Sequence, residues 1–485
     1  MAPESTTHGR RPIAQPAPRP PALTRALILA AASLGQFMIQ LDLTIVNVAL
    51  PDIGRGLHGS NAGLQWVIDG YSLALASLLL IGGRIGDRSG HKRVYLAGLG
   101  IFGVGSALCA LAPSMGALVS FRVLQGIGAA IEMPATLAIV SHTFTGQRER
   151  AQAVGIWAGA AGTSLVIGPV LGGWLTDSFG WPAVFIVNLP VTAIVIAVTL
   201  VTVSEAAGPG RGGLDVPGQV LGAAALALLA AGVIEGGQYG FAGGRSLGLL
   251  AGGAASLTAF VSVERAGADP VLPLGYFRRA AYGAANAGGL VMGFVTVGLL
   301  FLFALFFQQV QGDSAVAAGL RFAPLTVAFV ITGPLVGRVI ERVGHRVPMA
   351  AGCAAMGAGC LLLLRVTASS GYAEIAWPFA VIGAGYGLTS TPMAAAVLGT
   401  VPRQRAGMAS STNLTARVAG GVFGVAILGS LLPSGRADGR AFAVAFSAGL
   451  HTALVVAGIV ALAGAVAAAA FIRPGPRAPG LGPEG

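Results

Sequence analysis

The sequence has few charged residues for its length. Asp, Glu, Lys and Arg make up 10% of the 485 residues, whereas a soluble globular protein has about 25%. Hydrophobic residues account for 54%. Such a chain cannot cover a water-facing surface with charge, which excludes an ordinary soluble enzyme and a disordered protein. The composition predicts a polytopic membrane protein.

Lysine and cysteine are also scarce, and each scarcity excludes a kind of chemistry. Lys92 is the only lysine, and it lies in the segment GHKR, where Arg stands in place of the Ser or Thr of a phosphate-binding loop. We therefore expect no ATP use and a dependence on an ion gradient. The three cysteines are odd in number and lie in apolar stretches, which argues against a disulfide framework. Because the sequence has no Ser/His/Asp arrangement, metal-ligand cluster or nucleotide fold, we expect no enzyme activity, metal or other cofactor.

Long apolar runs fill most of the chain. A bilayer core about 30 Å thick needs about 20 apolar residues per helix, and by this rule we predict fourteen spans. Their approximate limits are 25–50, 62–82, 94–112, 116–138, 151–176, 182–203, 217–234, 246–263, 282–309, 317–340, 348–366, 373–398, 406–432 and 445–472. Residues 1–24, rich in Pro and Arg, are predicted to be a disordered tail and not a signal peptide.

Basic residues alternate from one loop to the next. With both termini in the cytoplasm, 21 of the 29 Lys and Arg residues lie in the tails and cytoplasmic loops, 6 lie outside, and Arg122 and Arg417 lie within spans. The positive-inside rule therefore predicts an even number of spans with both ends inside. The net charge of +11 is explained by anchoring to anionic lipid, so no nucleic-acid partner is expected.

One loop sequence occurs twice. The segment GRIGDRSGHK at 83–92 is matched by GRVIERVGHR at 337–346, with eight of ten positions identical or conservatively replaced. A duplicated loop between corresponding helices predicts two homologous bundles related by an axis along the membrane normal. We expect an all-α membrane protein with tails at 1–24 and 473–485, a six-helix bundle at 25–203, a linker with two central helices at 204–280, and a second six-helix bundle at 281–472.

Several motifs resemble those of the major facilitator superfamily, in its fourteen-helix drug:proton antiporter branch. The loop at 83–92 resembles the signature of the superfamily, and LVSFRVLQGIGAA at 118–130 is similar to its fourth-helix signature. The segment GPVLGG at 168–173 resembles the fifth-helix motif of antiporters. Further similarities to the branch are LDLTIVNVALP at 41–51, WVIDGY at 66–71, FIVNLP at 185–190 and AGMAS at 406–410.

Three ionisable residues are predicted to lie at one level of the first bundle. At about 1.5 Å per residue, Asp42, Asp69 and Arg122 fall in the outer third of their spans. Charges inside a membrane are costly and mark functional sites by default. We expect these three to satisfy one another, with Asp42 and Arg122 as a switching pair rather than a static one. For Asp69 a coupled and a structural role are equally favoured, and Arg417 either belongs to the site or hydrogen-bonds backbone carbonyls.

Glu132 stands where the family usually has an apolar residue. It lies about 15 Å deeper than Arg122 and about 20° from Gln125 around the helix, which places both on the face expected to line the cavity. No basic residue is evident at that depth, so desolvation is expected to favour the protonated carboxyl. Glu132 either releases a proton to the cavity or to a cationic substrate, or stays neutral and hydrogen-bonds a backbone carbonyl.

A polar stripe and an aromatic segment are further candidates for the cavity wall. Gln36, Gln40 and Asn47 fall within about 40° on the first span and are predicted to line the cavity. The Phe-rich segment at 301–307 either lines a drug pocket or faces lipid.

The loop motif and the fifth-helix motif are expected to serve conformational change. The resemblance implies a cytoplasmic latch in which Asp87 binds a neighbouring helix N-terminus, where the dipole favours anions. A solvated charge cluster is the alternative. The predicted latch residues are Gly83, Asp87, Arg88, Gly90 and Lys92.

In the fifth helix, Gly168 and Pro169 permit a kink, and Gly172 and Gly173 leave a bare surface for a neighbouring helix. The resemblance implies that this helix seals the interface between the bundles. A kinked packing helix without a gating role is the alternative.

The resemblance implies a monomeric proton-coupled antiporter in a bacterial cytoplasmic membrane, exporting hydrophobic drugs or antibiotics, cationic ones among them, by alternating access. A proton-coupled metabolite exporter or importer on the same scaffold is one alternative. A non-transporting membrane receptor or scaffold is another, against which the buried carboxyl groups argue.

Overall fold

The computed structural model describes residues 21–205, 215–267, 272, 274–402, 405–433 and 440–472. Within these residues all regular structure is helical and no β-strand occurs, as the predicted all-α fold requires. Most of the two predicted tails, and part of the linker after residue 203, lie outside the described residues.

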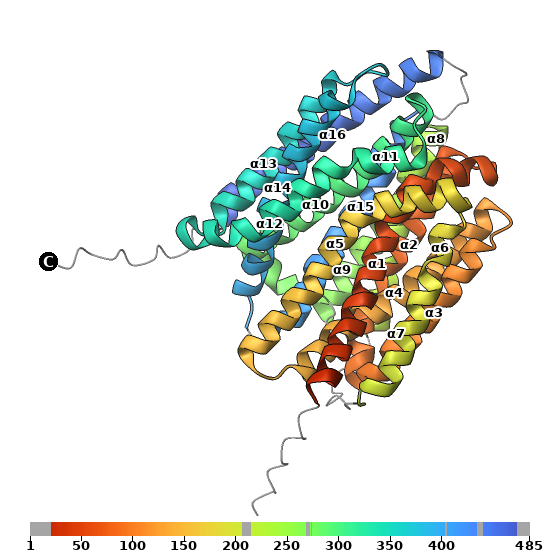
Figure 1. Cartoon of the computed structure of the whole chain (residues 1–485). Coiled ribbons are helices and arrows are strands. Elements are labelled where there is room, and N and C mark those ends of the chain that lie inside the picture. The colour runs from red at the N-terminus through yellow and green to blue at the C-terminus, as the bar shows by residue number, and fades with distance from the viewer. Residues whose placement is uncertain are drawn as a thin grey trace, which may run out of the picture.

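The early helices, red to yellow, fill one side of the molecule, and most of the later helices, green to blue, fill the other (Figure 1). The first group is α1 (Ala22–Gly56), α2 (Asn61–Ser89), α3 (His91–Ala110), α4 (Met115–Thr143), α5 (Gln147–Phe179), α6 (Ala183–Ile186) and α7 (Asn188–Thr202). A central pair follows, α8 (Val216–Tyr239) and α9 (Gly244–Ala266). The last group is η1 (Leu274–Arg278), α10 (Ala280–Leu305), η2 (Phe306–Val310), α11 (Ala315–Arg321), α12 (Ala323–Val343), α13 (Arg346–Leu362), η3 (Leu363–Arg365), α14 (Tyr372–Gly399), α15 (Ala406–Ser430) and α16 (Arg440–Phe471).

The two groups pack their helices in the same order. In the first, α1 packs on α5, and α2 and α3 pack on α4. In the second, α10 packs on α15, and α12 and α13 pack on α14. The repeated loop also ends a helix in the same way in both copies, since Gly90 after α2 and Gly344 after α12 have positive φ angles of 94° and 72°. Glycine adopts such angles without steric cost. The shared packing supports the predicted duplication.

Twelve helices in the described part of the chain are long and apolar enough to cross a membrane, or thirteen if the bent α5 counts as one span. The helix α2 is 29 residues long but is not among the twelve. The predicted count of fourteen therefore stays a prediction.

Two predicted spans are each assigned as two helices, although Ala183–Thr202 and Ala315–Gly333 each count as one candidate membrane span. The predicted span 182–203 consists of α6 and α7, which are separated at Val187. The predicted span 317–340 contains the junction between α11 and α12 at Phe322, and Pro324 occupies the first turn of α12. Proline lacks an N–H and is tolerated at the start of a helix but not in its interior, so it favours a new helix start. Apolar periodicity alone does not reveal such breaks.

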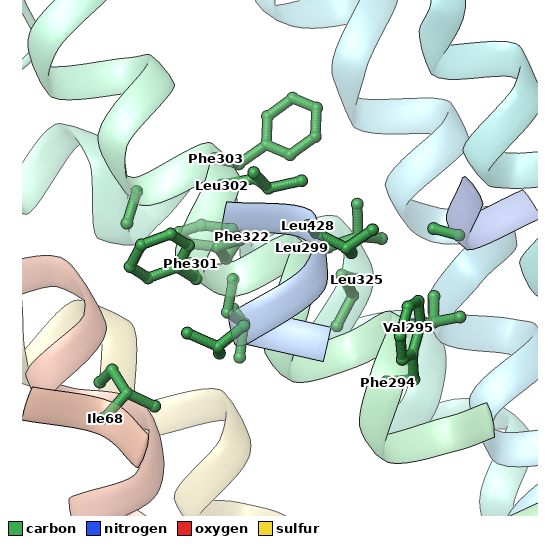
Figure 2. Close-up of a cluster of buried hydrophobic side chains, with 14 of the residues drawn as sticks. Ile68, Phe294, Val295, Leu299, Phe301, Leu302, Phe303, Phe322, Leu325 and Leu428 are labelled. Carbon is green, nitrogen blue, oxygen red and sulfur yellow. The ribbon is translucent and has the colours of Figure 1, made fainter. Parts of the chain in front are cut away.

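Neither prediction for the Phe-rich segment is correct. Phe301, Phe303, Phe306 and Phe307 are fully buried, so they face neither lipid nor an open pocket. They belong to a core cluster that also includes Ile68 of α2, and Figure 2 shows part of it. Ring pairs at 4.9–6.3 Å between centroids join Phe303, Phe306 and Phe307 to one another and to Phe322, Phe379 and Phe446. Offset and edge-to-face aromatic pairs of this kind stabilise a core.

Hydrogen bonds join the two groups at the end where α1 finishes, which the charge distribution predicts to be the outer end. The Nδ2 atom of Asn61 donates to the carbonyl of Pro433 at 2.8 Å. The Nε2 atom of Gln308 donates to the carbonyl of Val48 at 2.8 Å. The molecule is therefore closed at this end.

The contact between α5 and α11 adds to the same closure. The two carboxylate oxygens of Asp177, near the end of α5, accept from the backbone N–H groups of Ala315 and Val316 at 3.1 and 2.9 Å. These N–H groups have no partner within their own helix, and the helix dipole favours an anion there.

Candidate functional site

Asp42 of α1 and Arg122 of α4 form a buried ion pair. The side-chain exposure is 0% for Asp42 and 1% for Arg122, and the Nη1 atom of Arg122 donates to Oδ2 of Asp42. A buried ion pair is stable only when its remaining donors and acceptors are also satisfied. The structure thus places the first predicted pair in contact.

Gln125 connects the pair to a third helix. Its Oε1 accepts from Nη1 of Arg122 at 2.7 Å, and its Nε2 donates to Oδ1 of Asp42 at 2.8 Å. The same Nε2 donates to the hydroxyl of Ser106 on α3 at 2.7 Å. Asn188, the first residue of α7, donates to Oδ1 of Asp42 at 3.3 Å and to Ser106 at 3.2 Å. Asp42 therefore accepts from three side chains, two on α4 and one on α7.

The helix α2 supplies two further contacts of Arg122. The Nε atom donates to the carbonyl of Val67 at 3.0 Å, and the guanidinium lies 4.3 Å from the ring centre of Tyr71. A cation close to an aromatic face is attracted by the ring quadrupole. Tyr71 in turn donates to the carbonyl of Ile39 on α1 at 3.2 Å. Five helices, α1, α2, α3, α4 and α7, thus meet in one polar network, which we call the five-helix network.

Asp69 does not join this network, so the prediction that all three charges satisfy one another is wrong. At about 100° per residue, Asp69 lies about 200° around α2 from Val67 and from Tyr71, on the opposite side of the helix. Its neighbours on that side are Gln65, which donates to two carbonyls of α15, and Leu73, which packs against α8 and α15. Asp69 is fully buried, and neither of its carboxylate oxygens has a hydrogen-bond partner among the described residues.

Glu132 is a second buried carboxyl without a hydrogen-bond partner in the described part of the chain. It lies inside the first group of helices, where two glycines make room for it. A Cβ atom at Gly35 of α1 would lie 2.6 Å from its Oε1, and one at Gly98 of α3 would lie 2.9 Å from its Cβ. Of the two predicted roles, the one that requires a backbone hydrogen bond has no such bond in this structure.

The predicted polar stripe on α1 is partly buried. Gln36 and Asn47 are buried, and Gln40 is half-buried. Asn47 donates to the carbonyl of Leu43 in its own helix at 2.9 Å, while the side-chain oxygens of Gln36 and Asn47 have no partner among the described residues. Arg417 lies apart from the five-helix network and donates to the hydroxyl of Tyr386 on α14 at 3.4 Å rather than to a backbone carbonyl.

The loop at 83–92 is held against the end of α7. The Nζ atom of Lys92 donates to the carbonyl of Leu200 at 2.9 Å, and Arg93 pairs with Glu205 at 3.5 Å. Arg88 is exposed. The side chain of Asp87 lies outside the described residues, so the predicted contact with a helix N-terminus stays a prediction. Gly83 faces α4, where a Cβ atom would lie 3.7 Å from Pro134.

The helix α5 is bent by 44° between Gln152–Ser164 and Ile167–Phe179, close to Pro169. A Cβ atom at Gly168 would lie 2.9 Å from the Cβ of Thr44, and one at Gly172 would lie 2.6 Å from the carbonyl of Ile45. These two glycines therefore let α5 approach α1 closely.

Gly173 of α5 and Gly319 of α11 allow a close approach between the two groups of helices. A Cβ atom at Gly173 would lie 2.7 Å from the carbonyl carbon of Ala315 on α11, and one at Gly319 would lie 2.7 Å from that of Pro169. The backbones of α5 and α11 thus touch without intervening side chains. This contact is what a helix sealing the interface between bundles requires.

Ser106, Asn188 and Tyr71 were not predicted as site residues. Ser106 carries no signal in a single sequence, since small polar residues are common in apolar helices. Asn188 lies in the segment FIVNLP, where an amide in an apolar run was the available signal. The two glycines beside Glu132 have no sequence signal that separates them from other helical glycines.

Residues 32–425 match the family described as Major Facilitator Superfamily. The chain belongs to this superfamily. It is therefore a multi-pass membrane transporter and not an enzyme, and the resemblance found in the motifs is confirmed. Among the described residues, no group of three or more His, Cys, Asp or Glu side chains could hold a metal ion.

Relatives of this transporter have names that refer to drug resistance. It is 39% identical over 84% of its length to the multidrug resistance protein Stp of Mycobacterium tuberculosis, covering 76% of that protein. It is 34% identical to the methylenomycin A resistance protein of Streptomyces coelicolor, over 84% of this chain and 85% of that protein. It is 35% identical to the tetracenomycin C resistance and export protein of Streptomyces glaucescens, over 84% of this chain and 76% of that protein.

A solved structure shares the fold. The transporter resembles a bacterial homologue of the human lysosomal transporter Spinster, in an inward-facing and unoccupied conformation, with a TM-score of 0.65 and 20% identity over 93% of this chain and 98% of that one. At this identity the likeness establishes the fold alone.

Proposed function

We propose that this transporter exports hydrophobic drug-like molecules, lipophilic cations among them, across the bacterial cytoplasmic membrane in exchange for protons. The observation that carries the proposal is Asp69, a fully buried carboxyl with no hydrogen-bond partner in the part of the chain that the structure describes, on the face of α2 that packs against α15 and α8. An unpaired carboxylate is very costly to bury, so such a group binds a proton when water is excluded and releases it when water returns. Movement of the two groups of helices would change its hydration.

In this proposal the five-helix network carries the second part of the coupling. Asp42 and Arg122 act as a switching pair. Gln125 and Asn188 each bond both Asp42 and Ser106, so either amide can release Asp42 and keep Ser106 as the helices tilt. Glu132 is the third carboxyl, and it provides a place for a proton deeper in the first group. The names of the relatives support small, drug-like substrates.

The conformational cycle is proposed on the same grounds. The two groups of helices are the bundles at 25–203 and 281–472, both termini lie in the cytoplasm, and the monomer is the working unit. The bare surface of α5 seals the interface, and the loop around Asp87 latches the cytoplasmic side in the opposite state. Closure at the predicted outer end corresponds to an inward-facing state.

Transport by the purified protein in liposomes with an imposed pH gradient tests the proposal. A panel of lipophilic cations, neutral antibiotics and anionic metabolites is scored for movement and for counter-movement of protons. We expect at least one drug-like compound to move against the proton flow. The antiport proposal fails if every substrate found moves independently of protons.

A further inference from the structure

A small cavity at the predicted outer end is lined by Gln65, one turn of α2 from Asp69. It has a volume of about 20 Å³ and lies where α2, α8 and α15 meet. A cavity of this size holds one water molecule when polar groups line it. Its polar lining comes from all three helices: Ser60, Asn61, Gln65, Gln238 and Ser430.

The polar residues of α2 lead from this cavity towards Asp69. Asn61, Gln65 and Asp69 are four residues apart and therefore share one face of the helix. Gln65 lines the cavity, and Asp69 lies one turn, about 6 Å, deeper. Gln65 is 2% exposed and donates to the carbonyls of Val425 and Ala426 on α15, at 3.0 and 3.3 Å. It is the last polar side chain of this face before the unpaired carboxyl.

The charged groups on the neighbouring helices are engaged elsewhere. On α8, Glu235 pairs with Arg245 of α9 at 3.4 Å. On α15, Arg417 donates to Tyr386. On α4, Arg122 is bound to Asp42 on the far side of α2. Glu132, also on α4, lies between the glycines of α1 and α3 and not at α15.

We propose that protons reach Asp69 from the outer side through this cavity, along a route past Gln65 that is separate from the path of the substrate. In the step itself, a hydronium ion that has passed from the cavity beyond Gln65 gives up its proton to a carboxylate oxygen of Asp69, which leaves one water molecule and a neutral carboxylic acid. The route runs between α2 and α15 and is walled by α8. The helix α8, the first of the two central helices, thus contributes to proton transfer. The inference rests on the proposed proton-coupled function.

The test compares two buried glutamines, one next to the route and one away from it. Gln65 and Gln308 are both buried at the outer end, and each donates to a backbone carbonyl of the other group of helices. The change Gln65→Leu removes the polar group next to Asp69. The change Gln308→Leu removes a hydrogen bond between the two groups of helices that lies away from the route.

Proteoliposomes containing a pH-sensitive dye and ethidium, a fluorescent lipophilic cation, provide two readouts. One is the initial rate of proton-coupled ethidium exchange under a pH gradient, and the other is ethidium counterflow at equal pH, which needs no net proton transfer. We expect Gln65→Leu to slow the coupled exchange about tenfold or more, as when a polar group needed for proton transfer is lost, and to leave counterflow unchanged. Gln308→Leu should resemble the wild type in both.

Equal coupled rates for Gln65→Leu and the wild type would overturn the route, as would an equal slowing by both variants, since that would indicate a weakened joint. If Gln65→Leu does not fold, Gln238→Leu at the cavity wall replaces it with the same expectation. Absence of proton movement in the wild type would overturn the proposed function itself. That outcome is visible before any variant is measured.

Discussion

Asp42 and Asp69 lie on consecutive helices and are both fully buried, yet their surroundings are opposite. Asp42 has Arg122, Gln125 and Asn188 around it, all within the first group of helices. Asp69 has no hydrogen-bond partner among the described residues and faces the second group across α15. One carboxyl is held by its own bundle, and the other depends on how the two bundles meet.

Movement of the two bundles is therefore expected to affect the surroundings of Asp42 and Asp69 differently. A carboxylate with an arginine and two amides stays satisfied while its bundle moves as a unit. A carboxyl at the interface between bundles gains or loses water whenever the interface opens. Asp42 is therefore expected to matter for both stability and transport, and Asp69 for transport alone.

Removing Arg122 should produce the largest effect. The change Arg122→Gln leaves Asp42 as a buried charge without its cation, which costs about 3 kcal/mol or more. We expect a lower Tm and loss of transport, measured by thermal unfolding in detergent. A Tm equal to that of the wild type would show that the amides alone can hold Asp42.

Changing Asp42 should reduce stability less than changing Arg122 does, but should abolish proton coupling. Asp42→Asn keeps the hydrogen-bonding shape and leaves Arg122 with Val67, Tyr71 and Gln125, so we expect a folded protein with some loss of stability and no gradient-driven transport. The double change Asp42→Asn with Arg122→Gln should regain stability but not coupling. Normal transport by Asp42→Asn would make the pair structural at most.

The change Asp69→Asn should separate transport from stability. Because no partner is lost, we expect its Tm to stay within the range of surface substitutions, a change of about 0.5 kcal/mol or less in stability. Proton-coupled transport should fall strongly, while counterflow at equal pH persists. A fall in Tm as large as that of Arg122→Gln would contradict the comparison, because it would reveal a hidden partner.

Glu132 sharpens the comparison, since it is unpaired like Asp69 but lies inside one bundle like Asp42. The change Glu132→Gln mimics the protonated carboxyl at nearly constant volume. We expect it to reduce cation transport or its pH dependence, with a smaller effect on neutral substrates, measured as transport rate against pH. An unchanged pH profile for every substrate would assign Glu132 a structural role only.

The sequence predicts the helical fold well because apolar length is a property of each segment by itself. The repeat and the motifs were enough to identify the family. The spans across Val187 and Phe322 are confirmed as single candidate spans, but the short interruptions at these residues were not predicted, since apolar periodicity continues across them. The buried Phe301–Phe307 segment was missed for a related reason, because lipid-facing and core-facing helices are equally apolar.

The site was predicted in part. Asp42 and Arg122 were placed at one depth, and depth follows from counting residues along a helix. Asp69 was placed at the same depth but paired wrongly, because depth says nothing about direction around the helix, and direction decided the outcome. The hydroxyl of Ser106 and the space left by Gly35 depend on which helices become neighbours, and no single segment contains that information.

The single lysine makes the loop motif at 83–92, where α2 meets α3, chemically addressable. Since Lys92 is the only lysine of the chain, an amine-reactive label attached to a side chain marks this loop alone. Its Nζ atom is engaged with the carbonyl of Leu200, so its nucleophilicity depends on whether the loop stays docked on α7. The chain thus carries a built-in reporter for the predicted cytoplasmic side, to which a fluorophore can be attached without engineering a cysteine.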